Sequence, residues 1–116
     1  MTRQISRIDA MRPGEIDDIP FDFSADLTSG ETISSAPVIA EWNEGEADAS
    51  AQSIVTGSPV VGNVVDGVFT ANAAGGFVLQ RITAHSTDTA YYLACTVTLS
   101  SGRKLTAAAI LPVRKL

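Results

Sequence analysis

The sequence predicts a single all-β domain, and three observations lead to this class. Beyond residue 12, no stretch repeats its apolar residues with the 3.6-residue period of a helix. Short apolar runs recur instead, separated by Gly, Pro, Ser, Asn and Asp, which is typical of a sandwich or a barrel. The chain has 116 residues, the usual size of one domain with one core.

Seven segments have strand character: residues 19–23, 32–42, 53–56, 64–70, 77–83, 91–99 and 104–113. In the first, Ile19, Phe21 and Phe23 alternate with other residues and therefore share one face. Pro37 requires a bulge, an edge or a break in the second segment. Asp66-Gly67 is a turn dipeptide, so residues 64–70 are expected to contain part of a hairpin.

The alternation is clearest in residues 91–99. One face of this segment is expected to line the core and carries Tyr91, Leu93, Cys95, Val97 and Leu99. Residues 100–103, Ser-Ser-Gly-Arg, predict a tight hairpin to the last segment. Seven short strands fit an immunoglobulin-like antiparallel β-sandwich formed by residues 15–116. A jelly roll or a small barrel is the alternative.

Residues 1–14 are expected to form an extended N-terminal arm outside the sandwich. Their apolar and basic residues fit one short amphipathic turn, which is too short to be a stable helix in water. The segment is therefore either a frayed terminus or an arm that orders on a neighbouring subunit. With the C-terminal tail, it gives the expected interface residues: Arg3, Ile5, Arg7, Ile8, Met11, Arg12, Arg114 and Lys115.

The net charge of −5 is unevenly distributed along the chain. Residues 13–80 contain eleven acidic residues and no Lys or Arg. Nucleic acid is not expected as a partner, because phosphate binding needs a basic face. An acidic face that docks on basic neighbours is the alternative to simple solubility. No apolar run is long enough to predict a membrane span or a secretory signal, so a cytoplasm-like compartment is expected.

The sequence predicts no catalytic, cofactor or metal site. His85 lies with Ser86 and Asp88 in a polar segment that is interpreted as a solvated turn. Cys95 lies in an apolar strand and is interpreted as a small buried residue. The acidic residues of 44–48 lack the EF-hand pattern, so an exposed loop is expected there and not a calcium site.

Two segments of the chain carry a resemblance to a known group. Residues 13–36 contain an aromatic–Asp–aromatic strand and a Gly–acid–Thr–Ile turn, and residues 91–116 contain a Ser-Gly-Arg hairpin with a Leu-Pro-Val tail. The matching positions are Phe21, Asp22, Phe23, Leu27, Gly30, Glu31, Thr32, Ile33, Gly102 and Arg103. They resemble small tailed-phage virion structural proteins of the fibre–tail adaptor or neck type. A Trp that often follows the Gly–acid–Thr–Ile segment has no match before Pro37, and Trp42 comes later.

The resemblance implies an immunoglobulin-like domain and a non-enzymatic place in the virion, as an adaptor joining the tail or neck to fibres or neighbouring tail proteins. Such a protein is assembled in the host cytoplasm, contacts other virion proteins and is expected to form a homo-oligomer in the particle. A head decoration or cement protein is the first alternative. A carbohydrate-binding β-sandwich is the second, and its aromatic platform would come from Trp42, Tyr91 and Tyr92.

Overall fold

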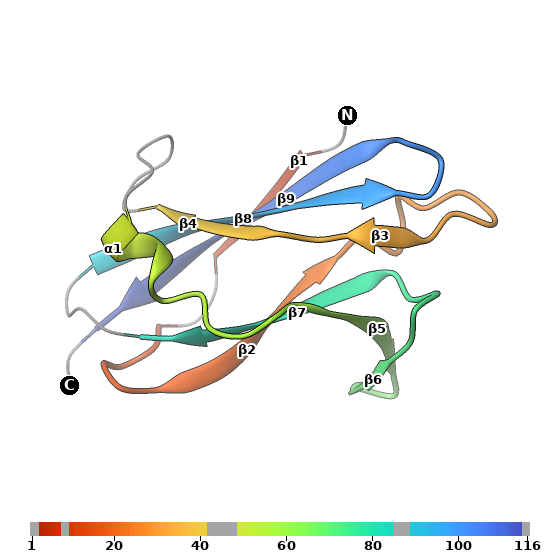
Figure 1. Cartoon of the computed structure of the whole chain (residues 1–116). Coiled ribbons are helices and arrows are strands. Elements are labelled where there is room, and N and C mark those ends of the chain that lie inside the picture. Colours follow the sequence, from red (N-terminus) through yellow and green to blue (C-terminus); the bar gives the residue numbers. More distant parts are fainter. Residues whose placement is uncertain (1–2, 8–9, 42–48, 85–88, 115–116) are drawn as a thin grey trace.

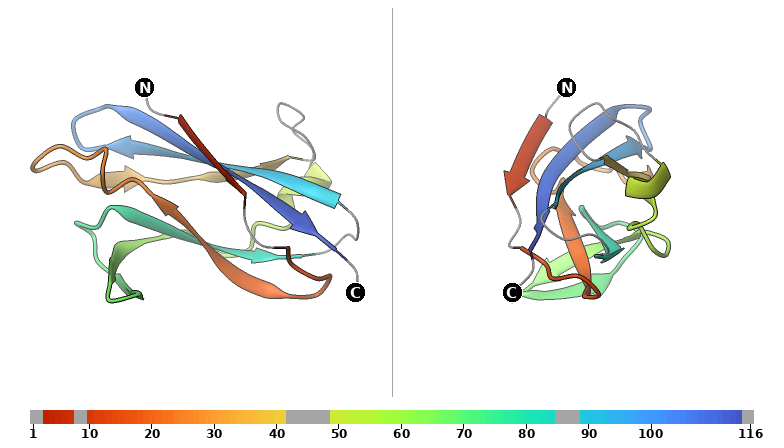
Figure 2. Two further views of the ribbon diagram at one scale, coloured as in Figure 1. Left: turned by 180° about the vertical axis from the view of Figure 1, so that it is seen from behind. Right: turned by 90° about the vertical axis from the view of Figure 1, so that its left-hand side faces the viewer.

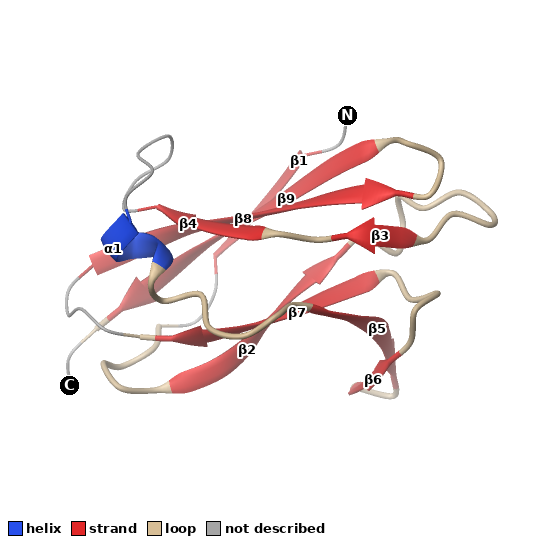
Figure 3. Cartoon of the chain, in the orientation of Figure 1, coloured by secondary structure: helices blue, strands red, loops and turns tan. Residues whose placement is uncertain are grey.

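Two β-sheets face each other across one hydrophobic core in the computed structural model of the chain (Figures 1 and 2). The structure describes residues 3–7, 10–41, 49–84 and 89–114. In the described residues the one helical turn is α1 (Ala49–Gln52), and the other elements are strands (Figure 3), so the all-β class is confirmed. No helix in the described ranges has the length and apolar character needed to cross a membrane.

Sheet A, the five-stranded sheet, is built around the hairpin of β8 (Thr89–Leu99) and β9 (Lys104–Val113). These two strands pair antiparallel over ten residue pairs, from Thr89 with Val113 to Thr98 with Lys104. The predicted hairpin over residues 91–113 is therefore confirmed. β1 (Arg3–Arg7) pairs with the other side of β9, and β3 (Ile33–Ser35) and β4 (Val38–Glu41) both pair with β8.

The break between β3 and β4 lies at Pro37, where the sequence predicted a bulge, an edge or a break. Pro37 lies between the two strands, and the pairing register with β8 shifts within β3. A proline cannot donate a ladder hydrogen bond, which is why one long strand is not formed here. The carbonyl of Pro37 still accepts a hydrogen bond from the Thr96 N–H at 3.2 Å, so the chain stays alongside β8.

Sheet B has the order β2-β7-β5-β6. β2 (Ile16–Asp22) pairs antiparallel with β7 (Phe77–Thr83), and β7 pairs with β5 (Val60–Val65). β5 and β6 (Val68–Ala71) form a hairpin whose turn residues, Asp66 and Gly67, have φ angles of 52° and 77°. Two positive φ angles define a type I′ turn, so the predicted hairpin at Asp66-Gly67 is confirmed.

The core lies between the sheets and follows the predicted alternation. Ile19 and Phe21 of β2 turn inward, as does Phe23 just after it, and the five predicted inward residues of β8 are all buried. Val78, Gln80 and Ile82 face them from β7. Gln80 is the one buried polar side chain among the described residues, and its Nε2 donates to the carbonyls of Thr56 and Gly57 at 3.2 and 3.0 Å.

The structure corrects the strand predicted at residues 53–56. Only Val55 forms an isolated bridge there, to Ile82 of β7, and the strand proper begins at Val60. The carbonyls of Thr56 and Gly57 bond to the Gln80 side chain instead of to a neighbouring strand. Nine strands lie within the described ranges, compared with about seven expected. The strand at 53–56 is lost, the segments 32–42 and 64–70 each give two strands, and β1 is added.

The N-terminal segment also differs from the prediction. Residues 3–7, expected in an arm outside the sandwich, form β1 and pair in parallel with residues 106–110 of β9. Met11 bonds to both sides of Val113: its N–H donates to the Pro112 carbonyl at 2.9 Å and its carbonyl accepts from the Arg114 N–H at 2.8 Å. Met11 itself is only 5% exposed. The physical reason is that β9 has an open edge, and pairing with it gives this short segment the backbone partners that an isolated helical turn would lack.

Removing residues 1–7 is therefore expected to destabilise the free domain by about 1–3 kcal/mol, because β9 loses one hydrogen-bonded neighbour. Urea unfolding of the full chain and of the truncated chain measures the difference. Unchanged unfolding midpoints would mean that the pairing of β1 with β9 contributes nothing in solution.

Cys95 is expected to be unreactive in the folded protein. It is fully buried, and burial raises the pKa of its thiol to about 12, so almost no thiolate forms at neutral pH. A thiol reagent should label it only after denaturation. Cys95→Ser should cost about 1–3 kcal/mol, since a hydroxyl is more polar than a thiol in this core. Rapid labelling under native conditions would contradict the assignment of this face of β8 to the core.

Candidate functional site

A loop from one resembling segment and a turn from the other lie side by side at one end of the molecule. In Figure 1 the loop before β3 and the turn between β8 and β9 project together, and the reverse view in Figure 2 shows the same arrangement. Thr32 and Ser100 join them directly: the Ser100 N–H donates to the Thr32 carbonyl at 2.8 Å, and the Thr32 N–H donates to Ser100 Oγ at 3.0 Å. Ile33 is the register partner of Leu99.

The centre of this contact is a two-bond ion pair between Glu31 and Arg103. Arg103 Nη2 donates to Glu31 Oε1 at 2.6 Å, and Arg103 Nε donates to Oε2 at 3.0 Å. The guanidinium also donates from Nη2 to the carbonyl of Asp26 at 2.8 Å. A planar guanidinium that meets a carboxylate through two parallel bonds has a fixed orientation. Arg103 therefore orients the β2–β3 loop relative to the hairpin.

Three further donors converge on the same carboxylate. The Thr28 N–H and the Thr28 hydroxyl donate to Glu31 Oε1 at 2.8 and 2.7 Å, and the Ser101 hydroxyl donates to Oε2. The Glu31 side chain is only 6% exposed, whereas that of Arg103 is 44% exposed. Loop, hairpin and carboxylate thus form one unit, which we call the Glu31–Arg103 clasp and define as Asp26, Thr28, Glu31, Ser101 and Arg103.

The hydrogen bonds hold the pKa of Glu31 well below its ordinary value of 4.5. The bond from Arg103 contributes most, followed by the bond from Ser101 and those from Thr28. Each of these donors stabilises the charged carboxylate relative to the acid. Glu31 therefore stays ionised in the folded protein at pH values where a free glutamate is protonated.

The other resemblance residues lie in the core and in the turns next to the clasp. Phe21 and Phe23 are buried in the core, and Leu27 packs against it. Asp22 Oδ1 accepts from the Ser24 N–H at 2.9 Å and from the Ser24 hydroxyl at 2.6 Å, which turns the chain out of β2. Gly30 and Gly102 have φ angles of 85° and 92°, which place both turns in the left-handed region. The resemblance residues therefore serve internal architecture.

Sequence reasoning identified Glu31 and Arg103 but did not predict their pairing or the other three members of the clasp. Thr28 had a recognisable signal, because Thr-x-x-Glu is the spacing at which a hydroxyl residue and a carboxylate exchange local hydrogen bonds. Ser101 had none beyond its place in the turn. The Asp26 contact uses a backbone carbonyl, so no side-chain pattern reports it.

The expected interface residues lie along one edge of sheet A. Arg3, Ile5 and Arg7 belong to β1, and Arg12 and Arg114 are exposed beside the bridge between Met11 and Val113. Ile8 and Lys115 lie outside the described residues. Met11 contributes to the chain's own core and so differs from the prediction that a partner buries it. The fold therefore brings basic residues from both ends of the chain to a common edge.

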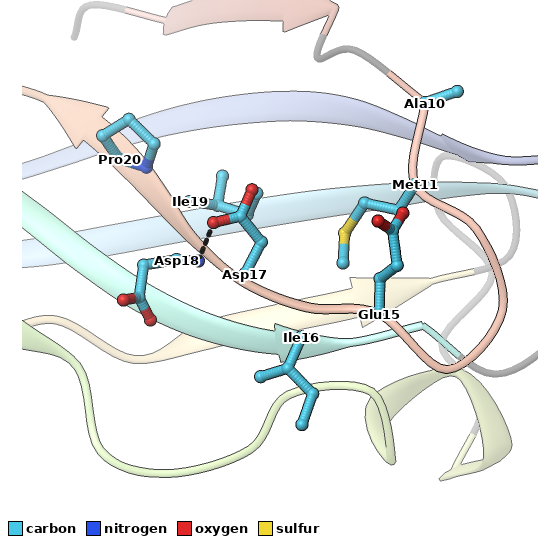
Figure 4. A pocket seen from close by; sticks show the side chains of 8 residues that line it. All are labelled: Ala10, Met11, Glu15, Ile16, Asp17, Asp18, Ile19 and Pro20. Carbon is cyan, nitrogen blue, oxygen red and sulfur yellow. Dashed lines mark hydrogen bonds between the residues drawn. The ribbon is translucent and has the colours of Figure 1, made fainter.

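A hollow of about 350 Å³ lies beside this edge, between the segment before β2 and β2 itself (Figure 4). Figure 4 shows the carboxylates of Glu15 and Asp17 on the side of Met11, and Ile16 pointing away from it. Glu15 Oε1 accepts from the Arg12 N–H at 2.6 Å, and Asp17 Oδ1 accepts from the Asp18 N–H at 2.8 Å. The charged groups that line the hollow are carboxylates, so it suits a cationic group better than an anion.

The remaining candidate residues divide into buried and undescribed ones. Tyr91 is 1% exposed and faces the core, so it belongs to no surface platform for a sugar, and Tyr92 is half-buried. Trp42, the acidic residues of 44–48, His85, Ser86 and Asp88 lie outside the described residues. Among the residues that are described, no three His, Cys, Asp or Glu side chains are grouped as metal ligands.

Comparison with known proteins leaves the family of this chain open: no protein-family model matches the sequence, and no curated protein matches it.

The clasp predicts a specific pH dependence of stability. Because the pKa of Glu31 is lowered by folding, its contribution is complete above the ordinary value of 4.5 and declines as the pH falls toward the folded pKa. Glu31→Gln should lower the melting temperature at pH 7 by more than at pH 3. Thermal unfolding across this range measures the effect.

Asp18→Asn is the matched control for this prediction. This substitution removes the Asp18–Arg81 pair, which is also joined by two bonds. The side chains of this pair are more exposed, 36% for Asp18 and 60% for Arg81. Exposed pairs contribute little, so its melting temperature should change less than that of Glu31→Gln. Equal effects of the two substitutions would show that the clasp has no special role.

Proposed function

We propose that this chain is a non-enzymatic structural protein of a tailed-phage virion, an adaptor that joins the tail or neck to fibres or to neighbouring tail proteins. The observation that carries the proposal is the Glu31–Arg103 clasp. The two resembling segments are far apart in the sequence, yet Glu31 of one binds Arg103 of the other through two bonds. The residues that carry the resemblance therefore belong to one structural unit, and this contact supports the proposal.

The arrangement of the strands supports the immunoglobulin-like part of the proposal. β2 and β7 lie in one sheet, while β3, β4, β8 and β9 lie in the other. The chain changes sheets between β1 and β2, between β2 and β3, between β4 and β5, and between β7 and β8. Immunoglobulin-like domains divide their B and E strands from their C, F and G strands in this way. The β5–β6 hairpin then takes the place of the strand next to E.

Surface charge supports a role in binding other proteins. Basic residues from both ends of the chain lie at the β1 and β9 edge of sheet A, and the acidic residues of β2 lie on sheet B. The acidic hollow lies beside the basic edge, so an acidic neighbour and a basic neighbour can bind next to each other on this domain. An adaptor needs two such surfaces.

The alternatives differ in the support that they receive. A head decoration protein would also be a β-sandwich with charged binding surfaces, so fold and charge do not distinguish it from an adaptor. The position in the particle distinguishes the two. A carbohydrate-binding module loses one of its three expected aromatic residues, because Tyr91 is buried in the core. We therefore retain the adaptor as the proposal and the decoration protein as an outcome of its test.

The test locates the chain in particles of the phage that encodes it. Gradient-purified particles are labelled with gold-conjugated antibodies raised against this chain, and separated heads and tails are analysed by mass spectrometry. The proposal predicts label at the tail or neck and peptides in the tail fraction. Label over the heads would favour the decoration protein. Absence of the chain from purified particles, despite its presence in infected cells, would refute a virion role.

A further inference from the structure

The free edges of the sheets differ in how their backbone groups are protected. β4 is an edge strand of sheet A, and the Gln52 side chain covers part of it. Gln52 Oε1 accepts from the Ala40 N–H at 2.8 Å, and Gln52 Nε2 donates to the Val38 carbonyl at 3.0 Å. One carboxamide thus occupies the position that a further strand would take.

β2 is one edge of sheet B, and Pro20 interrupts its outer side. The Phe23 N–H donates to Gly76, and the Glu15 carbonyl accepts from Ala84, so alternate residues of β2 bond toward β7. By this alternation the nitrogen of Pro20 faces outward, where it offers no donor. The carboxylates of Asp17, Asp18 and Asp22 surround it along the same strand. Proline and charge are the usual means of preventing strand addition.

β6 is the opposite edge of sheet B and has none of these features. Its four residues, Val-Phe-Thr-Ala, include no charged residue and no proline. The Asn72 N–H donates to the Val61 carbonyl at 2.9 Å, so Val68, Thr70 and Asn72 bond toward β5. The backbone groups of Phe69 and Ala71 therefore point away from the sheet. Among the described residues, neither makes a backbone hydrogen bond on that side.

Exposed apolar side chains lie on the hairpin that carries this edge. Six large hydrophobic residues are exposed in the described part of the chain, and four of them belong to the β5–β6 hairpin: Val60, Val64, Val65 and Val68. Val65 and Val68 are 63% and 64% exposed. Phe69 lies against Gly62 so closely that a Cβ at that glycine would be 2.5 Å from the ring. An uncharged edge with exposed valines is typical of a strand that pairs with another chain.

We propose that β6 pairs antiparallel with β6 of a second copy of this chain, around a two-fold axis at Thr70. In this register Phe69 lies opposite the second copy's Ala71, and Ala71 opposite the second copy's Phe69. The two outward N–H groups and two outward carbonyls of each copy then all find partners. The two sheets B become one continuous sheet of eight strands. This inference is independent of the virion role.

The second copy is the occupant that fits this edge because the strand is complementary to itself. Its two outward residues are symmetric about Thr70, so antiparallel pairing satisfies every group without a register shift. β6 brings no charge to the axis, although each copy carries a net charge of −5. Four-residue strands bury little area, so the dimer is weak in dilute solution and is strengthened where an assembly holds copies close together.

The test places like charges at the axis and then opposite charges. Thr70 is exposed, and Thr70→Lys places two lysines directly opposite each other in the dimer. Sedimentation equilibrium of the full chain up to about millimolar concentration should show a dimer whose dissociation constant rises roughly fivefold or more in this variant. Thr70→Glu should have the same effect. An equimolar mixture of the two variants should restore association, because lysine then faces glutamate.

A second measurement reports the register and does not depend on the variants. Hydrogen exchange of the Phe69 and Ala71 amides in the unmodified chain should slow as its concentration rises, while the Thr70 amide, bonded within the hairpin, should not change. Ile39→Lys, at an exposed position on β4, is the control for added charge and should leave association unchanged. Circular dichroism checks that each variant is folded.

Three outcomes would overturn the proposal. A chain that stays monomeric throughout the concentration range has no such interface. A dimer unaffected by Thr70→Lys uses another surface. A loss of association that the mixture of variants fails to restore means that the two Thr70 residues do not face each other.

Discussion

Ten consecutive residue pairs join β8 to β9, and the rest of sheet A is attached to this ladder. β3 and β4 pair with the free side of β8, while β1 pairs with the free side of β9. The inward face of β8 is apolar at every second residue and forms the floor of the core against β2 and β7. A hairpin this long fixes the register of its neighbours, since a shift of one residue would turn the apolar face of β8 to solvent.

The turn of the same hairpin carries the Glu31–Arg103 clasp. The clasp links the β8–β9 ladder to β3, the strand of sheet A that follows β2 in the chain. The ion pair is not an isolated surface pair, because three other donors bind the same carboxylate. The clasp fixes the position of β3 at the point where the chain crosses from sheet B to sheet A. The residues of the resemblance therefore have a structural role in this fold, because they hold the β2–β3 loop against the hairpin.

Binding surfaces must then be sought at the edges and the outer faces. The β1 and β9 edge collects basic residues from both ends of the chain, and the acidic hollow beside β2 lies next to it. At the far side of sheet B, β6 offers backbone groups without charge or proline. The basic edge and the acidic hollow adjoin each other, whereas β6 lies at the opposite edge of sheet B from β2. The proposed pairing of β6 with a second copy and the proposed contacts of an adaptor therefore use different parts of the domain.

The sequence by itself determined the β class, the hairpins at Asp66-Gly67 and at residues 100–103, the interruption at Pro37 and the inward face of β8. These are local properties: period-two alternation, turn dipeptides and the missing N–H of proline act within a few residues. Only the tertiary structure decided that Glu31 meets Arg103, that Gln52 covers β4 and that residues 3–7 join β9. Each of these contacts joins parts of the chain that the sequence separates. Each contact depends on which strand edge or charged group lies nearby once the two sheets have folded. A local sequence pattern holds no information about that spatial arrangement.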